Sequence, residues 1–355
     1  MSSTTTVIAM TSALLALSSI AGFLIYVVVR YSPIVARIFE EKPMFLPLRI
    51  PRVAEGEDVT FRTEDRLRLA GTYLKARTPT RIGVLVFCHE YLSDRWSALP
   101  YVDHFRDQGF DLFSFDFRNH GESPSDPDYN PLQWVTEHEL YDLRAALAYL
   151  RDRPDADPAG VGLFGVSRGG GTALCVAAAD PRVWGVITDG AFPTRGTMTA
   201  YILRWAEIYV GSPRFWKIMP KALFEFLGWS GRARTQLKLH CRYPDVERAT
   251  ARLAPRPWLM IHGQKDAYIG LDIAKGLFGH ARDPKELWVV AGAKHNRCRE
   301  KDPAAYADRI SAFVRKYAPR GPVQVAEPEQ QAAANPPLPF EAPPVRAEIG
   351  VPVAG

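Results

Sequence analysis

Short, uninterrupted apolar runs recur along most of the chain, and stretches with helical periodicity lie between them. The first run, Gly83–Cys88, reads GVLVFC, which is typical of a strand buried on both faces. The later runs are Asp111–Phe115, Val161–Phe164, Val183–Thr188, Trp258–Ile261 and Leu287–Val290. The helical stretches are Tyr101–Gln108, Trp134–Leu150, Gly169–Ala179, Ile273–Phe278 and Ala304–Lys316. This alternation predicts an α/β fold whose mainly parallel, twisted sheet is covered by helices on both faces.

Two further candidate strands precede these runs. Val59–Arg62 and Leu67–Leu74 flank a polar turn at 63–66, a pattern that predicts a β-hairpin. Together with the six buried runs, the hairpin gives an expected sheet of eight strands. We expect the whole domain to span residues 56–320.

One segment interrupts the alternation. Between Phe192 and about Thr250 no strand pattern occurs, and the apolar, aromatic-rich stretches Tyr201–Val210 and Phe215–Leu227 have helical character. We therefore expect a helical cap, inserted at about 193–250 and lying over the sheet.

The predicted cap is basic and rich in aromatic residues. Ten Lys or Arg residues stand against four acids, which gives the segment a net charge of +6. The interleaved aromatic residues are Tyr201, Trp205, Tyr209, Phe215, Trp216, Phe224, Phe226 and Trp229. Such a surface suggests contact with anionic lipid headgroups and an apolar route to a site. The alternative is that these aromatic side chains only pack the cap onto the sheet.

The N-terminus carries a long uncharged segment. From Val7 to Val29 there is no charged residue, and these 23 residues would span roughly 34 Å as a helix, enough to cross a bilayer core. A cleaved signal peptide fits less well, because Met1–Thr6 contains no Lys or Arg and the apolar run is long. We predict a membrane anchor at 1–30, followed by a juxtamembrane segment at 31–55.

Basic residues lie on only one side of this predicted span. No Lys or Arg precedes it, and the residues that follow include Arg30, Arg37, Lys42, Arg49 and Arg52. By the positive-inside rule, the sequence predicts a single-pass membrane protein whose main domain faces the cytoplasm.

The composition argues against a nucleic-acid-binding protein and indicates a disordered C-terminal tail. The formal net charge of +5 is mild for 355 residues, and basic and acidic residues are mixed along the chain, so there is no nucleic-acid signature. Beyond about residue 320 the chain becomes rich in Pro and Ala without apolar periodicity, which predicts a disordered tail at 321–355.

The cysteines and glycines suggest no metal or cofactor. Cys88, Cys175, Cys241 and Cys298 form no CxxC pair, so we expect free thiols in a reducing compartment and no metal site. The glycines at 169–171 lack both a Walker lysine and dinucleotide spacing, so no cofactor is expected.

The segment 165–169 reads G-V-S-R-G and has the context of a nucleophile elbow. It directly follows the strand run VGLF and opens the helical pattern GGTALCVAAA. On a sharp strand-to-helix turn, Cβ atoms at Gly165 and Gly169 would collide with the backbone. Their absence lets Ser167 project from the sheet. Ser167 is therefore the candidate nucleophile.

A serine hydroxyl needs a base to take its proton, and the base needs an orienting acid. His295 lies in the loop after the last strand run, and Asp266 lies in the loop after Trp258–Ile261. Because parallel strands end at one edge of the sheet, we expect both to reach Ser167. Asp189, at the end of the preceding strand run, is the alternative acid.

The ordered set of Ser167, Asp266 and His295, each placed after a strand, resembles the triad of the α/β-hydrolase family. The stretch 116–123 is similar to that family's D-x-R-x-H-G-x-S loop, and HGQKDAYI at 262–269 resembles its acid loop. The resemblance covers about Asp58 to Tyr317. It implies the α/β-hydrolase fold and a serine hydrolase mechanism.

The resemblance also implies an oxyanion hole built from two backbone N–H groups. One is that of Arg168, the residue after the nucleophile. The second normally follows the first core strand in a His-Gly pair, but here the segment reads His89-Glu90-Tyr91, so Glu90 or Tyr91 supplies it. An inward carboxylate would oppose the oxyanion at a cost of about 3 kcal/mol. We therefore expect the Glu90 side chain to point away and to pair with a nearby arginine.

These features together predict hydrolysis of carboxylic esters through an acyl-enzyme on Ser167, with a small-molecule or lipid acyl ester as substrate. A peptidase or thioesterase of the same mechanism is an alternative, as is a non-catalytic, membrane-tethered binding protein on a hydrolase fold. Enzymes of this fold with a carboxylate nucleophile are disfavoured, because the elbow carries Ser.

Overall fold

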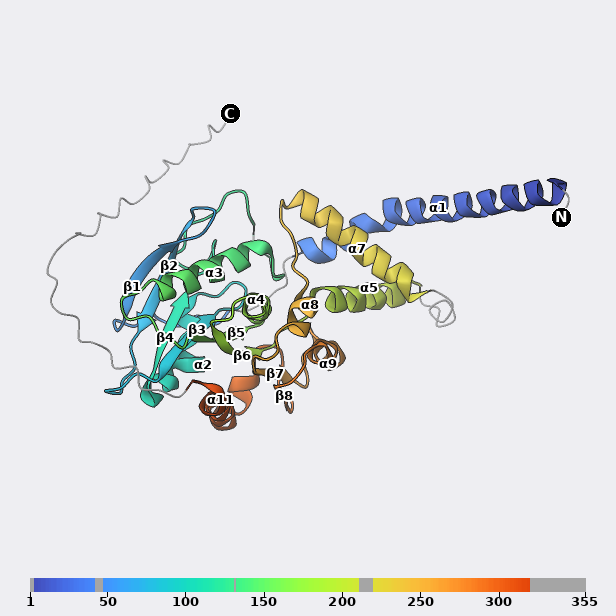
Figure 1. Cartoon of the computed structure of the whole chain (residues 1–355). Coiled ribbons are helices and arrows are strands. Elements are labelled where there is room, and N and C mark those ends of the chain that lie inside the picture. Colours follow the sequence, from blue (N-terminus) through green and yellow to red (C-terminus); the bar gives the residue numbers. More distant parts are fainter. Residues whose placement is uncertain (1–2, 42–46, 131, 211–219, 320–355) are drawn as a thin grey trace, which may run out of the picture. The chain divides into compact units, whose positions relative to one another are not determined.

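A sheet of eight strands lies at the centre of the computed structural model, which describes residues 3–41, 47–130, 132–210 and 220–319 (Figure 1). The strand order is β1-β2-β4-β3-β5-β6-β7-β8. The strands are β1 (Glu57–Arg62), β2 (Arg68–Leu74), β3 (Gly83–Cys88), β4 (Phe110–Phe115), β5 (Val161–Val166), β6 (Val183–Asp189), β7 (Trp258–Gly263) and β8 (Lys285–Val290). The β1–β2 and β2–β4 pairs are antiparallel and the others are parallel. The predicted eight-stranded, mainly parallel sheet is confirmed.

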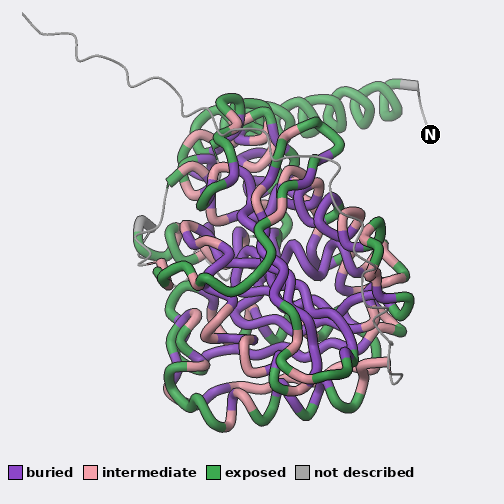
Figure 2. Tube along the Cα trace, turned by 90° about the vertical axis from the view of Figure 1, so that its left-hand side faces the viewer, coloured by how far each residue is buried: buried purple, intermediate pink, exposed green. Residues whose placement is uncertain are grey.

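Helices cover both faces of this sheet. The described helices are α1 (Ser3–Glu40), α2 (Ala98–Val102), α3 (Glu137–Arg151), α4 (Arg168–Ala177), α5 (Thr194–Val210), α7 (Lys221–Lys238), α8 (Val246–Ala251), α9 (Leu271–His280), α10 (Cys298–Lys301) and α11 (Pro303–Tyr317). One core cluster joins the sheet to α3, α4 and α9, and the other joins it to α2 and α11. Figure 2 shows the resulting buried centre.

The predicted helices differ from the observed ones in their bounds, as the first two show. The stretch 101–108 is divided into the end of α2 and a 3₁₀ helix, Asp103–Gln108, although Tyr101 and Phe105 are both buried as expected. Helix α3 begins three residues later than predicted. The Thr136 side chain caps it and Glu139 reaches back to the Thr136 N–H, so the capping box sets the start.

The insertion between β6 and β7 is helical, and its described residues contain no strand. Phe224 and Leu227 of α7 are buried in a third apolar cluster with Met198 and Ile202 of α5. Trp205 and Trp229 are exposed. Packing therefore explains only some of the aromatic residues. Of the others, Phe215, Trp216 and the Tyr209 side chain lie outside the described residues.

Helix α1 continues through Pro33 to Glu40, so the juxtamembrane segment predicted to begin at residue 31 is helical in its first part. Its N-terminal half is exposed, whereas Val35 and Phe39 are buried against the cap. By length and composition α1 could cross a membrane, a test that a signal sequence also passes.

Candidate active site

The segment 165–169 forms a sharp turn between β5 and α4. Ser167 has φ 51° and ψ −115°, a conformation that costs a non-glycine residue free energy. A Cβ at Gly165 would lie 2.5 Å from the Gly169 carbonyl oxygen, and a Cβ at Gly169 would lie 2.1 Å from the Cys88 carbonyl oxygen. The Ser167 N–H donates to the Asp189 carbonyl at 2.7 Å, which helps to hold the turn. Both flanking glycines are therefore sterically required.

The three candidate catalytic side chains meet at the carboxyl ends of β5, β7 and β8. Ser167 Oγ lies 3.0 Å from His295 Nε2, and His295 Nδ1 lies 2.6 Å from Asp266 Oδ2. The other carboxylate oxygen, Asp266 Oδ1, accepts the N–H groups of Tyr268 and Ile269 at 2.9 and 2.8 Å. The acid is thus held by its own loop, with one oxygen left for the imidazole.

Asp189, the alternative acid, takes a different partner. Its Oδ2 accepts the hydroxyl of Tyr306 at 3.0 Å, and burial raises the pKa of Asp189 to about 6. The imidazole Nδ1 of His295 pairs with Asp266. The geometry therefore favours Asp266 as the orienting acid.

His89 fixes the orientation of the peptide bond between Glu90 and Tyr91. Its Nδ1 donates to the Glu90 carbonyl at 2.7 Å, and its Nε2 accepts the N–H of Phe117 at 3.1 Å. Burial lowers the pKa of His89 to about 3, so the ring is neutral. In a trans peptide the C=O and N–H point in opposite directions, so the Tyr91 N–H points away from His89. Since Tyr91 lines the same cavity as Ser167, its N–H is the better candidate for the second oxyanion donor.

The Arg168 side chain runs beneath this region and is fully buried. Its guanidinium donates to the Leu132 carbonyl at 3.1 Å, pairs with Glu139 at 3.5 Å, and lies 5.3 Å from the centre of the Tyr91 ring. Arg168 therefore contacts the residue that carries the second candidate donor. The sequence motif signalled only the backbone of Arg168, because nothing in its spacing indicates where the side chain goes.

Glu90 is buried and lines the cavity beside Ser167. Its carboxyl is bonded by serine hydroxyl groups and not by the expected arginine. Ser97 Oγ lies 3.4 Å from Glu90 Oε2, and Ser93 also bonds the carboxyl. The expected pairing with an arginine is wrong for the described residues. The chain turns back at Leu92, where φ is 65°, and this turn brings the serines to the carboxyl.

Burial raises the pKa of Glu90 to about 7, against hydrogen bonds from Ser93 and Ser97 that lower it. The folded protein thus keeps this proton up to about pH 7, whereas the unfolded chain releases it near 4.5. The folded state binds more protons in that window, so stability falls as the pH rises through it. Above pH 7 the cost reaches about 3 kcal/mol.

Glu90→Gln is therefore expected to flatten the decline in unfolding free energy between pH 4.5 and 7. Urea unfolding of the full chain in detergent micelles, measured across that range, tests this. Glu286→Gln is the matched control, because Glu286 pairs with Lys316 at the surface. An unchanged profile in the Glu90→Gln variant would show that its carboxyl does not carry the proton.

The cavity beside Ser167 has a volume of about 420 Å³, a size suited to a small-molecule ligand. Its wall combines aromatic, apolar and basic side chains: Tyr91, Tyr101, Tyr268, Leu48, Lys265 and Lys294. Sequence reasoning missed Leu48 and Tyr268. Leu48 lies before the predicted domain, and only the tertiary path of the chain brings it to the site.

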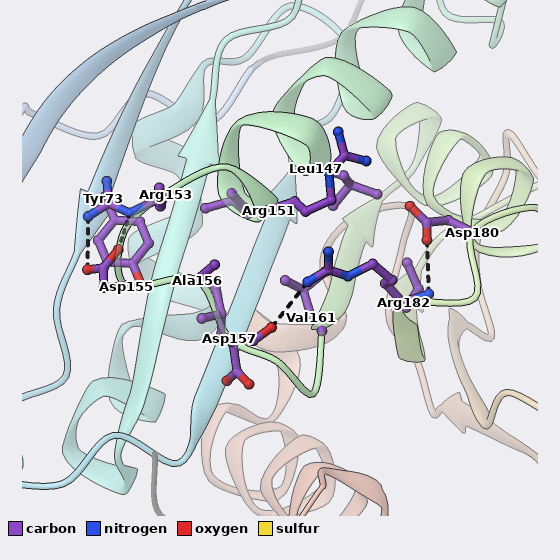
Figure 3. A pocket seen from close by; sticks show the side chains of 14 residues that line it. Tyr73, Leu147, Arg151, Arg153, Asp155, Ala156, Asp157, Val161, Asp180 and Arg182 are labelled. Carbon is purple, nitrogen blue, oxygen red and sulfur yellow. Dashed lines mark hydrogen bonds and ion pairs between the residues drawn. The ribbon is translucent and has the colours of Figure 1, made fainter. Parts of the chain in front are cut away.

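A second cavity lies at the opposite end of the strands, where β3, β5 and β6 begin (Figure 3). Its volume of about 30 Å³ leaves room for roughly two water molecules. Arg153 bonds Asp155 at 2.7 Å, and Arg182 donates to the Asp157 carbonyl at 3.4 Å. This cavity is too small for an acyl substrate.

Within the described part of the chain, one group of side chains has a spacing compatible with a metal ion. Asp65, Asp126 and His138 bring ligand atoms within 4.8 Å of one another. The guanidinium of Arg118 contacts all three, at 2.7, 3.2 and 3.0 Å. The positively charged guanidinium already occupies the centre of this group, so the group does not suit a divalent metal ion.

Three observations identify the fold: the strand order, the turn at Ser167, and a match of residues 83–220 to the family model described as the alpha/beta hydrolase fold. The chain has the α/β-hydrolase fold, as the resemblance implied.

The chain is also similar to individual proteins and to solved structures. The chain is 25% identical over 253 residues to the uncharacterized protein YfhR of Salmonella typhi, which covers 69% of this chain and 76% of that protein. A stretch of 131 residues is 35% identical to the thiohydrolase aneE of Aspergillus aculeatus, covering 36% of this chain and 38% of that protein. Among solved structures it is similar to the esterase Pf2001 of Pyrococcus furiosus, with a TM-score of 0.58, 20% identity, and coverage of 79% and 100% of the two chains. The structural likeness, at this identity, shows the fold alone.

Proposed function

We propose that this protein is a serine hydrolase that cleaves carboxylic esters, with Ser167 as nucleophile, His295 as general base and Asp266 as the orienting acid. The observation that carries the proposal is the continuous hydrogen-bond chain from Ser167 Oγ through His295 to Asp266, with steps of 3.0 and 2.6 Å.

In this mechanism His295 Nε2 takes the Ser167 proton as Oγ attacks the ester carbonyl carbon. The tetrahedral oxyanion accepts hydrogen bonds from the N–H groups of Arg168 and Tyr91. The alcohol then leaves with the proton returned by His295, and an acyl-enzyme remains on Ser167. A water molecule, deprotonated in turn by His295, attacks the acyl carbonyl; the bond to Ser167 Oγ then breaks, His295 returns the proton to Oγ, and the acid is released. Asp266 holds the imidazole tautomer throughout and stabilises the imidazolium.

The aromatic and apolar side chains in the wall of the 420 Å³ cavity, which stand beside charged ones, support an apolar acyl ester, including a lipid ester, as the substrate class. A thioester is the second candidate, because the partial relative aneE is named a thiohydrolase. The same nucleophile and oxyanion donors serve both carbonyls.

We further propose that α1 anchors the protein in a membrane as a single pass, with the hydrolase domain on the cytoplasmic side. The uncharged run at 7–29 and the basic residues that follow it support this placement.

Labelling with a fluorophosphonate probe tests the chemistry, because the probe phosphonylates a serine only when a base activates it. The full chain in detergent micelles is expected to be labelled, and Ser167→Ala is expected to lose all labelling. Ser311→Ala, which removes a buried serine of α11, is the matched control and should label like the unsubstituted chain. A folded chain that resists the probe, or a Ser167→Ala variant that still labels, would refute the proposal.

A further inference from the structure

The C-terminal half of α1 is a structural part of the cap. Val27, Ser32, Val35 and Phe39 are buried and recur at the spacing of one helix face. A Cβ at Gly231 would lie 2.4 Å from the Val35 side chain, so the backbones of α1 and α7 approach closely. The anchor helix and the cap are therefore packed as one unit.

Contacts along the two helices show that they run in the same direction. Lys238 bonds Glu40 at 2.5 Å, Thr235 bonds the Ala36 carbonyl at 3.5 Å, and Gly231 lies against Val35. Both helices rise about 1.5 Å per residue, so continuing this register brings Phe224 close to the level of Val27. Val27 and Phe224 belong to the same buried cluster, which agrees with that register.

This level lies inside the uncharged run of α1, which ends at Val29. In Figure 1 the end of α5 and the start of α7 point in the same direction as the N-terminal half of α1. These helix ends pack beside the last turn of the uncharged run of α1. When that run crosses a bilayer, the helix ends must therefore reach the headgroup layer of the bilayer.

The side chains at this end of the cap suit that environment. Trp205 and Ile208 of α5 are 45% and 70% exposed, and Trp229 of α7 is 56% exposed. Tryptophan is favoured at the membrane interface, where its ring is apolar and its N–H can bond a polar group. Arg204 of α5 and Arg232 and Arg234 of α7 lie on the same helices as these side chains, together with the acids Glu207 and Glu225, and Arg30 follows the uncharged run of α1.

We propose that the end of α5 and the first half of α7, with Trp205, Ile208 and Trp229 as their apolar contacts, form a membrane-contact surface that lies in the headgroup layer of an anionic phospholipid bilayer. The occupant is the same bilayer that α1 crosses, because the register of α1 and α7 places the surface at its level. The inference rests on the proposed anchoring by α1 and is independent of the chemistry at Ser167.

This surface is connected to the cavity by a single helix. Tyr201 of α5 donates its hydroxyl to the Tyr268 carbonyl at 2.8 Å, and Tyr268 lines the cavity beside Ser167. Helix α5 thus joins the membrane-contact surface to the loop that carries the candidate acid. This arrangement suits an ester that enters the cavity from the membrane.

Nitroxide labels on Ile208→Cys and Trp229→Cys test the proposal in the full chain, reconstituted into vesicles of phosphatidylcholine and phosphatidylglycerol. Oxygen is concentrated in the bilayer and the nickel chelate in water. At both sites, the ratio of oxygen collisions to nickel-chelate collisions is therefore expected to exceed the value of a nitroxide label in aqueous solution. Ile82→Cys, an exposed apolar position directly before β3, is the matched control and should keep aqueous values. The four native cysteines are buried, and the unsubstituted chain gives their background.

Aqueous collision rates at positions 208 and 229 would overturn the proposal. Protection from both reagents would also overturn it, since that result indicates a second protein copy on this surface. Vesicle flotation of the unsubstituted chain tests the anchor by itself. A chain that does not float with the vesicles would refute both the anchoring by α1 and the membrane-contact surface that rests on it. Fluorophosphonate labelling reports the chemistry separately.

Discussion

Replacing Asp266 with asparagine is expected to lower kcat for ester hydrolysis on the order of 10⁴-fold, with KM little changed. The reason lies in the two oxygens of this carboxylate. Oδ1 accepts two backbone N–H groups, from Tyr268 and Ile269, while Oδ2 faces His295 Nδ1. The asparagine oxygen must stay with the two N–H donors, so its NH₂ group would face the imidazole. His295 would then carry its proton on Nε2, where it cannot accept the proton of Ser167.

Steady-state kinetics on a soluble p-nitrophenyl ester measures this loss. Asp189→Asn is the matched control, because Asp189 is buried near the site but accepts the Tyr306 hydroxyl, which an amide oxygen can also accept. It should lose far less activity than Asp266→Asn. If the two variants exchanged effects, or if Asp266→Asn kept activity within tenfold of the unsubstituted chain, another residue would have to orient His295.

The buried strands were the most predictable part of the fold. Gly83–Cys88 was predicted with its observed bounds, because a parallel strand covered on both faces leaves no polar position to blur its limits. The later strands extend past their apolar runs. Phe110 precedes its predicted run, and Val166 and Asp189 follow theirs, since backbone pairing continues where the apolar pattern has ended.

The end of α1 could not be predicted from the same signals. Arg30 and Arg37 marked where the uncharged run stops, but a charge ends a membrane span without ending a helix. The helix continues because Val35 packs beside Gly231 of α7 and Phe39 stacks on Tyr243, and these partners lie about 200 residues later in the chain. A local pattern cannot reveal a packing partner so distant.

At the candidate site, the chain order of Ser167, Asp266 and His295 predicted which strand ends would meet, and parallel topology brings those ends together. The surroundings of Glu90 were not predictable. Its partners, Ser93 and Ser97, depend on a turn at Leu92 with a positive φ, which no glycine or asparagine announces. The identities of reacting groups follow from chain order, whereas their neighbours follow from loop conformation.

Replacing Arg118 with methionine is expected to destabilise the protein by about 3–5 kcal/mol, more than any other single change proposed for the core. The Arg118 side chain is fully buried, and it bonds Asp142 at 2.7 and 2.9 Å and Asp65 at 2.7 Å. Asp142 is fully buried as well. Without the guanidinium it would be an uncompensated buried charge, or it would have to take up a proton.

The pH dependence of the variant distinguishes this cause from simple loss of packing. Burial already raises the pKa of Asp142 to about 6, against the opposing effect of Arg118, so removing Arg118 raises that pKa further. An acid whose folded-state pKa is raised favours the folded state at low pH. The Arg118→Met variant should therefore regain stability as the pH falls from 8 toward 5, and Asp142→Asn in the same background should restore part of it at pH 8.

Urea unfolding of the full chain in detergent micelles measures both effects. Arg151→Met is the matched control, since Arg151 pairs with Asp152 at the exposed end of α3 and should cost less than about 1 kcal/mol. If Arg118→Met does not fold at pH 8, the measurement is made at pH 5 and on the double variant. A loss in Arg118→Met no larger than in Arg151→Met would mean that water, and not the guanidinium, compensates the Asp142 charge. The loop that carries Arg118 would then be held mainly by Asp116, which accepts hydrogen bonds from the Glu122 N–H and the Ser123 hydroxyl.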